Sequence, residues 1–125
     1  MSEPALRGVV VCHGPLAPAL IAAAEHISGV NGALVPVSNT GCDRGLIERR
    51  VREAIGDGPA VVFVDMPSGS CLFAAMHTLK DSTGVKVVTG VNLAMLVDFI
   101  FHRELSVTEA AERAARAGSA AIKVP

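Results

Sequence analysis

A histidine and an aspartate each directly follow an apolar run of this chain. His13 comes after the run that ends at Cys12, and Asp65 comes after the run that ends at Val64. A neutral imidazole is a good acceptor of a phosphoryl group near neutral pH, because its ring nitrogen is nucleophilic without a separate base. A carboxylate that accepts a hydrogen bond from one ring nitrogen fixes the tautomer and leaves the other lone pair free. The two residues therefore predict a catalytic pair for phosphoryl transfer.

A short Ser/Gly turn after the aspartate adds a predicted phosphoryl-binding element. Ser68, Gly69 and Ser70 come just before a predicted helix, whose free backbone N–H groups and positive dipole end suit an anion. Ser70 is expected to donate a hydroxyl hydrogen bond and to act with the catalytic pair. Gly14, next to the histidine, is assigned to the same phosphoryl-binding set.

The spacing of these residues also permits other interpretations. Asp65 fits the N-cap of the following helix, the Ser/Gly turn fits an ordinary tight turn, and a lone histidine after a strand is often structural. A hydrolase with Cys71 or Cys12 as nucleophile and His13 as base is another hypothesis. A thiol in the first turn of a helix can have a lowered pKa, whereas Cys12 should point to the opposite face of its strand from His13. The phosphoryl-transfer interpretation is favoured because all its residues fall on one predicted rim.

That rim follows from the order of the predicted elements. Short apolar runs alternate with helical patterns, which predicts an α/β fold with a doubly wound, mainly parallel sheet and helices on both faces. The carboxyl ends of such strands share one edge, and His13 and Asp65 meet there if the first and third strands are neighbours, as in a doubly wound sheet. The predicted strands are Leu6–Cys12, Ala33–Val37, Pro59–Val64, Val85–Thr89 and a short final strand, Ala120–Val124. The predicted helices are Pro18–Ile27, a helix capped by Asp43 that ends before Gly56, Leu72–Leu79, Asn92–Phe101 and Val107–Ala117, the last with a Ser106/Glu109 capping box.

Composition limits the size and the partners of the protein. The chain has 125 residues, of which 50% are hydrophobic, and this predicts one domain over residues 1–125. The formal net charge of −1 and the absence of Trp and Tyr argue against a nucleic-acid binder. Three widely spaced cysteines form no Cys-x-x-Cys pair, so we expect no metal site and no cofactor. The first charge-free stretch, Gly8–Ala24, is too broken by prolines to span a membrane, and we expect a cytoplasmic protein.

Three segments together resemble the IIA component of the mannose-type phosphoenolpyruvate-dependent sugar phosphotransferase system (PTS). They are VVVCHGPLAPALIAAAEHISG (residues 9–29), VVFVDMPSGSCLFAA (61–75) and KVVTGVNLAMLVDFI (86–100). Their order and separation match the family over essentially the full chain. The chain departs from the family pattern around the site. It has Ser68-Gly69 in place of Gly-Gly, Cys71 and Ala94 in place of prolines, and an unusual Met66-Pro67 after the aspartate.

The resemblance implies a phosphohistidine carrier in sugar uptake and phosphorylation. His13 would take a phosphoryl group from the carrier protein HPr and pass it to a IIB component, with Asp65 as its partner and Ser70 as a phosphoryl-binding hydroxyl. The resemblance also implies a homodimer that exchanges the strand Ala120–Val124, and peripheral association with a membrane permease. A regulatory phosphoacceptor without its own permease and the phosphocarrier subunit of dihydroxyacetone kinase stay open as alternatives. The sugar and the phosphorylated ring nitrogen are left open.

Overall fold

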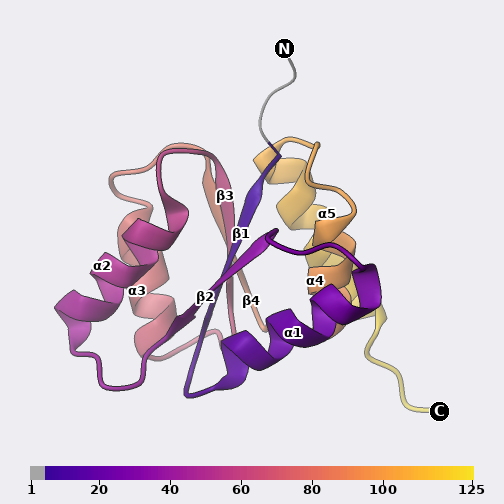
Figure 1. Ribbon diagram of the computed structural model, residues 1–125, viewed down its shortest axis with the longest axis horizontal. Helices are drawn as coiled ribbons and strands as arrows, with labels where there is room; N and C mark the ends of the chain where they lie inside the picture. Colours follow the sequence, from indigo (N-terminus) through magenta and orange to yellow (C-terminus); the bar gives the residue numbers. More distant parts are fainter. Residues whose placement is uncertain (1–4) are drawn as a thin grey trace.

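A four-stranded parallel sheet lies at the centre of the computed structural model, which describes residues 5–125 (Figure 1). The strand order is β2-β1-β3-β4, and every neighbouring pair is parallel. The strands are β1 (Arg7–Cys12), β2 (Leu34–Ser38), β3 (Ala60–Val64) and β4 (Val85–Thr89). The α/β class and the parallel sheet predicted from the sequence are confirmed.

Helices cover both faces of this sheet (Figure 1). One face carries α1 (Leu16–Ser28), α4 (Leu93–Ile100) and α5 (Val107–Ala120), and the other carries α2 (Arg44–Ile55) and α3 (Ser70–Thr78). Three helices begin at residues whose side-chain oxygens accept a hydrogen bond from a backbone N–H in the first turn, which stabilises the helix start. These residues are Asp43, Asn92 and Ser106.

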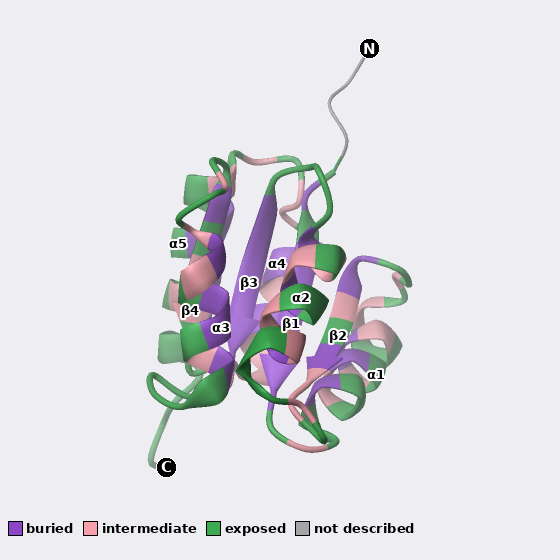
Figure 2. Ribbon diagram, turned by 90° about the vertical axis from the view of Figure 1, so that its left-hand side faces the viewer, coloured by how far each residue is buried: buried purple, intermediate pink, exposed green. Residues whose placement is uncertain are grey.

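The two central strands are buried on both sides, which explains their continuous apolar runs (Figure 2). Val10 and Phe63 belong to the core beneath α1, α4 and α5, whereas Val9 and Val62 belong to the core beneath α2 and α3. The ring of Phe63 meets Phe99 of α4 edge to face, with centroids 5.2 Å apart. A strand with two apolar faces holds the loop after it on a rigid base.

The C-terminal segment differs from the sequence-based prediction of a strand over Ala120–Val124. Helix α5 continues to Ala120, and the last residues are exposed and form neither helix nor strand (Figure 1). The alanine-rich run favours helix, and a strand needs an edge with which to pair. The predicted strand is therefore wrong for the isolated chain, and its exchange between two subunits stays a prediction.

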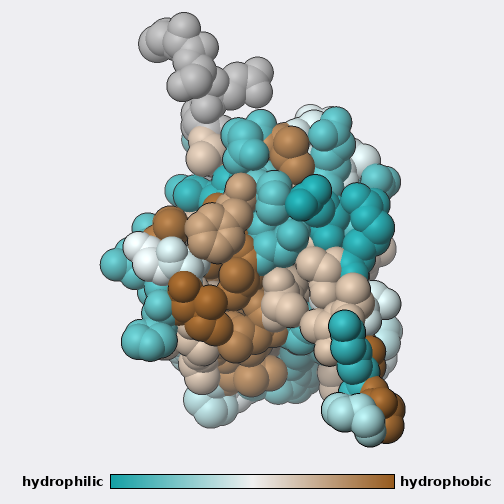
Figure 3. Space-filling model, turned by 90° about the vertical axis from the view of Figure 1, so that its right-hand side faces the viewer, coloured by the Kyte–Doolittle hydropathy of each residue, from teal (hydrophilic) through white to brown (hydrophobic). Residues whose placement is uncertain are grey.

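An apolar surface lies over α1 and α4 on the side shown in Figure 3. Ile27 and Phe101 are 58% and 54% exposed there. They flank a shallow groove of about 560 Å³ that Leu93, Val97 and Ala117 also line. None of the helices within residues 5–125 is both long enough and apolar enough to cross a membrane.

Candidate active site

The candidate site lies at the carboxyl ends of two neighbouring parallel strands whose following helices cover opposite faces of the sheet. Strands β1 and β3 are neighbours, with Val11 opposite Val64, but the helices that follow them leave on opposite faces. Such a switch point opens a crevice at the carboxyl ends of the strands. His13 follows β1 and Asp65 follows β3, so the fold brings together two residues that are 52 positions apart in the chain.

Asp65 holds the histidine by two hydrogen bonds to one carboxylate oxygen. His13 Nδ1 lies 2.7 Å from Asp65 Oδ2, and the backbone N–H of His13 donates to the same oxygen at 2.8 Å. The Asp65 side chain is only 9% exposed, whereas that of His13 is 45% exposed. The ring is therefore fixed from below and open to solvent above.

The protonation of the pair follows from the charge of the carboxyl group. Burial raises the pKa of Asp65, but the hydrogen bonds from the backbone and ring of His13 outweigh it and lower that pKa below its ordinary value. An ionised carboxylate can only accept hydrogen bonds. The ring proton of His13 is therefore on Nδ1, and this N–H donates a hydrogen bond to Asp65 Oδ2. The lone pair of a neutral ring is then on Nε2.

The Nε2 edge of the ring faces the start of α3. A Cβ placed on Gly69 would stand 3.7 Å from both Cε1 and Nε2 of His13. Gly69 has φ +91° and ψ −173°, a backbone conformation that is essentially restricted to glycine. This conformation lets the chain turn into α3 beside the His13 ring.

Asn39, which follows β2, connects the two sides of the site. Its Oδ1 accepts a hydrogen bond from the backbone N–H of Gly14 at 3.1 Å, and its Nδ2 donates to Ser70 Oγ at 3.4 Å. Ser38 donates to the carbonyl of Gly14 at 2.8 Å. From the sequence, Asn39 follows the second predicted strand and could line the rim, but nothing in the sequence requires it to. Strand β2 is the neighbour of β1, and this adjacency is the signal that would have identified its role.

The residue that caps α3 is Gly69 of the Ser/Gly turn and not Asp65. Helix α3 begins at Ser70 rather than at Leu72, and Gly69 is its N-cap, so the interpretation of Asp65 as an N-cap is wrong. Ser68 lies exposed in the turn. The predicted residues thus gather on one rim, as expected from the strand order.

The two thiols invoked by the hydrolase hypothesis are poor nucleophiles. Cys71 is fully buried in the first turn of α3, and burial together with the charge of Asp65 raises its pKa to about 11. Burial raises the pKa of Cys12 to about 12. We expected the helix start to lower the pKa of Cys71; burial and the neighbouring carboxylate have the opposite effect, so that expectation is wrong.

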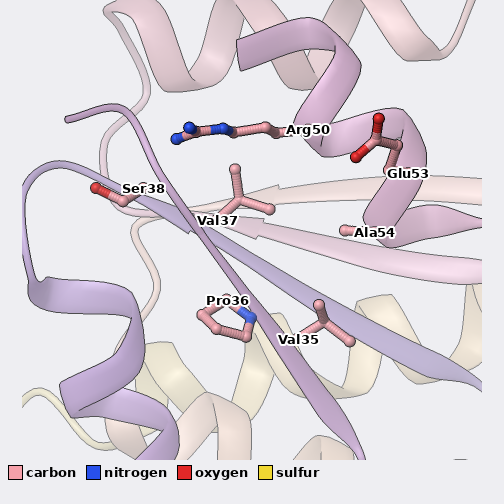
Figure 4. Close-up of a pocket in the computed structure, with 7 residues that line it drawn as sticks. All are labelled: Val35, Pro36, Val37, Ser38, Arg50, Glu53 and Ala54. Atoms are coloured by element: carbon pink, nitrogen blue, oxygen red, sulfur yellow. The ribbon is translucent and has the colours of Figure 1, made fainter. Parts of the chain in front are cut away.

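A second hollow lies outside the site, between the edge strand β2 and α2 (Figure 4). It measures about 460 Å³, and its lining includes Pro36, Arg50 and Glu53. The guanidinium of Arg50 donates a hydrogen bond to the thiol of Cys42 at 3.1 Å. The residues that line this hollow include no histidine.

A known protein family and several solved structures are similar to this chain. The family described as PTS system fructose IIA component (EIIA-man) matches residues 8–116. The EIIA component of the phosphotransferase system from Streptococcus agalactiae superposes with a TM-score of 0.88 at 18% identity, covering 95% of this chain and 96% of that one.

Two solved structures from Enterococcus faecalis extend the structural comparison. The mannose/sorbose specific IIA subunit gives a TM-score of 0.85 at 21% identity, with 98% of this chain and 96% of that one covered. A sigma-54 interaction domain protein gives 0.77 at 14% identity, with 95% and 94% covered. At these identities the structures establish a shared fold. A search of curated protein sequences found no match.

Proposed function

Because the chain belongs to the EIIA-man family of PTS components, we propose that it is a phosphocarrier in which His13 accepts a phosphoryl group from HPr and passes it to a IIB component. The proposal treats residues 1–125 as one phosphocarrier domain acting in the cytoplasm. The observation that carries it is the 2.7 Å contact between His13 Nδ1 and the buried carboxylate of Asp65. This contact directs the lone pair of the ring to the exposed side of the site.

Transfer begins when the phosphorus of a donor phosphohistidine approaches Nε2 of His13. The Nε2 lone pair forms a bond to phosphorus while the bond from phosphorus to the donor ring nitrogen breaks, and that electron pair returns to the donor ring. The acceptor ring becomes cationic because Nδ1 keeps its proton. Asp65 stabilises this charge through the hydrogen bond that already exists in the resting protein.

The start of α3 holds the transferred group. The Oγ of Ser70 accepts a hydrogen bond from Asn39, so its own proton is free to be donated to a phosphoryl oxygen. The backbone N–H groups after Gly69 and the positive end of the helix dipole contribute in the same direction. The amide of Gly14 is already bonded to Asn39, so we assign Gly14 to positioning the loop.

Exposed apolar residues around the ring provide a surface on which HPr and the IIB component could dock in turn. Leu16 and Met66 are 42% and 54% exposed, and Pro15 and Pro67 beside them are also exposed. Pro15 and Leu16 come shortly after His13 in the chain, and Met66 and Pro67 come directly after its partner Asp65. A homodimer and peripheral association with a membrane permease are part of the proposal, and the apolar groove of Figure 3 supports the former.

The test is phosphorylation in a reconstituted relay. The protein is incubated with phosphoenolpyruvate, enzyme I and HPr, with a His13→Ala variant as the control. We expect an acid-labile phosphoryl group on the protein, absent from the variant, and a ³¹P NMR signal of an Nε2-phosphorylated ring. Equal labelling of the two proteins, or no labelling of either, would contradict the proposal.

A regulatory phosphoacceptor without its own permease is the second candidate. The fold shared with a sigma-54 interaction domain protein supports it, as do the altered residues around the turn that begins at Asp65. The dihydroxyacetone kinase subunit is a third candidate with the same chemistry. Onward transfer from His13 to purified IIB protein favours the transport role, whereas a stable phosphoprotein with no transfer to IIB favours one of the alternatives.

A further inference from the structure

Three side chains of different chemistry converge beneath the His13 ring. Within residues 5–125, His13, Asp65 and Cys71 each offer one ligand atom, and these three atoms lie within 4.8 Å of one another. His13 Nδ1 is 2.7 Å from Asp65 Oδ2 and 3.7 Å from Cys71 Sγ. Imidazole, carboxylate and thiolate together form a donor set typical of Zn²⁺. The three residues come from separate segments of the chain, and from the sequence we expected no metal site.

From this grouping we propose that the site binds Zn²⁺ through His13 Nδ1, Asp65 and the Cys71 thiolate, and that the bound ion prevents His13 from accepting a phosphoryl group. The second part of the inference rests on the proposed function, whereas the first does not. The fourth position of a tetrahedral ion would face solvent, on the exposed side of the histidine.

The distances suit zinc after a small adjustment. Bond lengths of about 2.0–2.3 Å in a tetrahedral site separate neighbouring ligand atoms by roughly 3.3–3.6 Å. The separations from His13 Nδ1, 2.7 Å to Asp65 and 3.7 Å to Cys71, lie on either side of that range, and the third pair lies within 4.8 Å. The half-exposed ring has room to shift. The Sγ atom already touches Nδ1, so an ion that displaces the Nδ1 proton meets the thiol directly.

An unsatisfied oxygen in the same residue is an independent indication. The Asp65 side chain is only 9% exposed, and its Oδ1 is buried without a hydrogen-bond partner. A buried carboxylate oxygen without a donor is costly. A cation that Oδ1 also coordinates would compensate for that cost.

The proton balance explains why binding would block phosphoryl acceptance. Zn²⁺ takes the Nδ1 lone pair, so the ring proton leaves Nδ1 and a proton is placed on Nε2. The thiol of Cys71 loses its proton to solvent as the zinc–sulfur bond forms, and one proton is released in total. No electron transfer is involved. An Nε2 that carries a proton has no lone pair with which to attack phosphorus.

Cys42, whose side chain is half-buried, offers a matched control for Cys71. Cys42 lies outside the cluster and accepts a hydrogen bond from the guanidinium of Arg50 at 3.1 Å. A positive charge so close to the sulfur opposes cation binding. Cys42→Ala is therefore expected to leave zinc affinity unchanged, whereas Cys71→Ala removes one of the three ligands.

The binding test uses the full chain and the metal alone. Zn²⁺ is titrated against a chromophoric chelator, and Co²⁺ is used to detect a thiolate-to-cobalt charge-transfer band. Even outer partners of zinc ligands are worth about 10- to 100-fold in affinity, so loss of the Cys71 ligand is expected to weaken binding at least tenfold and to abolish the band. Cys71→Ser, which keeps the size of the side chain, gives the same result if Cys71→Ala fails to fold.

The regulatory test measures acceptance from pre-phosphorylated HPr, with and without Zn²⁺, against each variant's own zinc-free rate. We expect Zn²⁺ to slow the natural chain and Cys42→Ala alike, and to have little effect on Cys71→Ala. No zinc binding, or equal affinity in Cys71→Ala, overturns the site. Binding without slower acceptance overturns the regulation. A chain that never accepts a phosphoryl group refutes the proposed function instead, and the metal titration is still interpretable.

Discussion

Replacing Asp65 with asparagine is expected to slow phosphoryl acceptance by His13 about 30- to 150-fold. Asparagine keeps the shape of the side chain and one acceptor oxygen, so both hydrogen bonds to His13 can persist in neutral form. The variant removes only the negative charge. The change in rate therefore reports how strongly the carboxylate stabilises the cationic ring in the transition state.

The magnitude follows from the geometry of the pair. With Oδ2 2.7 Å from Nδ1, the charge of the carboxylate lies close to the ring. Two unit charges about 4 Å apart attract by about 4 kcal/mol at an effective dielectric constant of about 20. If roughly half of the ring charge has developed in the transition state, the loss is about 2 kcal/mol, or about 30-fold. A weaker, uncharged hydrogen bond adds about 1 kcal/mol and brings the loss to about 150-fold.

The assay is rapid-quench transfer from pre-phosphorylated HPr, with the apparent affinity for HPr measured separately. The rate constant of transfer is expected to fall while the affinity stays constant, because the Asp65 side chain lies beneath the ring and is only 9% exposed. Asp98→Asn is a matched control, since that carboxylate lies 3.6 Å from another histidine, His102. A folded Asp65→Asn protein with a rate within about threefold of the natural chain would refute the reasoning. An equal loss in Asp98→Asn would refute it as well.

Three further predictions concern stability. The pKa of Asp65 is lower in the folded protein than the ordinary 3.8, so its ionised form stabilises the fold above about pH 3.8, and this contribution is lost as the pH falls through the folded pKa. The difference in the free energy of unfolding between the natural chain and Asp65→Asn should therefore shrink on acidification. A difference that stays constant with pH in urea unfolding would contradict this. Gly69→Ala should lower the free energy of unfolding by about 1–3 kcal/mol, because alanine is strained at this φ and ψ; an unchanged denaturation midpoint would be inconsistent with that strain. Gly8→Ala should cost about 1–3 kcal/mol in the same measurement, because the added Cβ would lie 2.6 Å from Leu34 and 2.7 Å from Phe99; a variant as stable as the natural chain would show that these two side chains can move apart.

The central strands and their rim were predictable because burial on two faces leaves a clear pattern in the sequence. The run from Val9 to Val11 and the run from Val61 to Val64 have no polar interruption, which only a doubly covered strand tolerates. The positions of His13 and Asp65 followed directly, since each residue comes immediately after its strand. The adjacency of β1 and β3 was an assumption about strand order, and it is confirmed.

The contacts across the rim were harder to predict because they depend on where α3 begins. The sequence placed the start at Leu72, whereas the helix begins at Ser70. The earlier start puts Ser70 and Cys71 on the helix instead of in the loop, so that Cys71 joins the buried face of α3. Cys71, Ala74, Ala75 and Thr78 are all buried, and their spacing is that of one helix face. That spacing was available in the sequence and would have placed the thiol against the core near the histidine.

The C-terminal strand illustrates a different limit. A strand forms only where a neighbouring strand can pair with it. The sequence of one chain does not show which edge of the sheet is free for such pairing. In the isolated chain β4 is an outer strand of the sheet, and Ile122 and Val124 are 76% and 98% exposed. Local preference then decides, and it extends α5. A second copy of the chain would change that balance without any change in sequence.

Topology accounts for the convergence of the site, and individual side chains account for its chemistry. Any sheet in this order has a crevice where the helices after β1 and β3 part. A histidine there becomes a one-sided nucleophile only if a buried acceptor holds its other nitrogen, which Asp65 does from the next strand. The same arrangement puts the Cys71 thiol within 3.7 Å of the held nitrogen. In the proposed function, the contact that prepares His13 for phosphoryl transfer is thus also the contact through which a metal ion would compete with it.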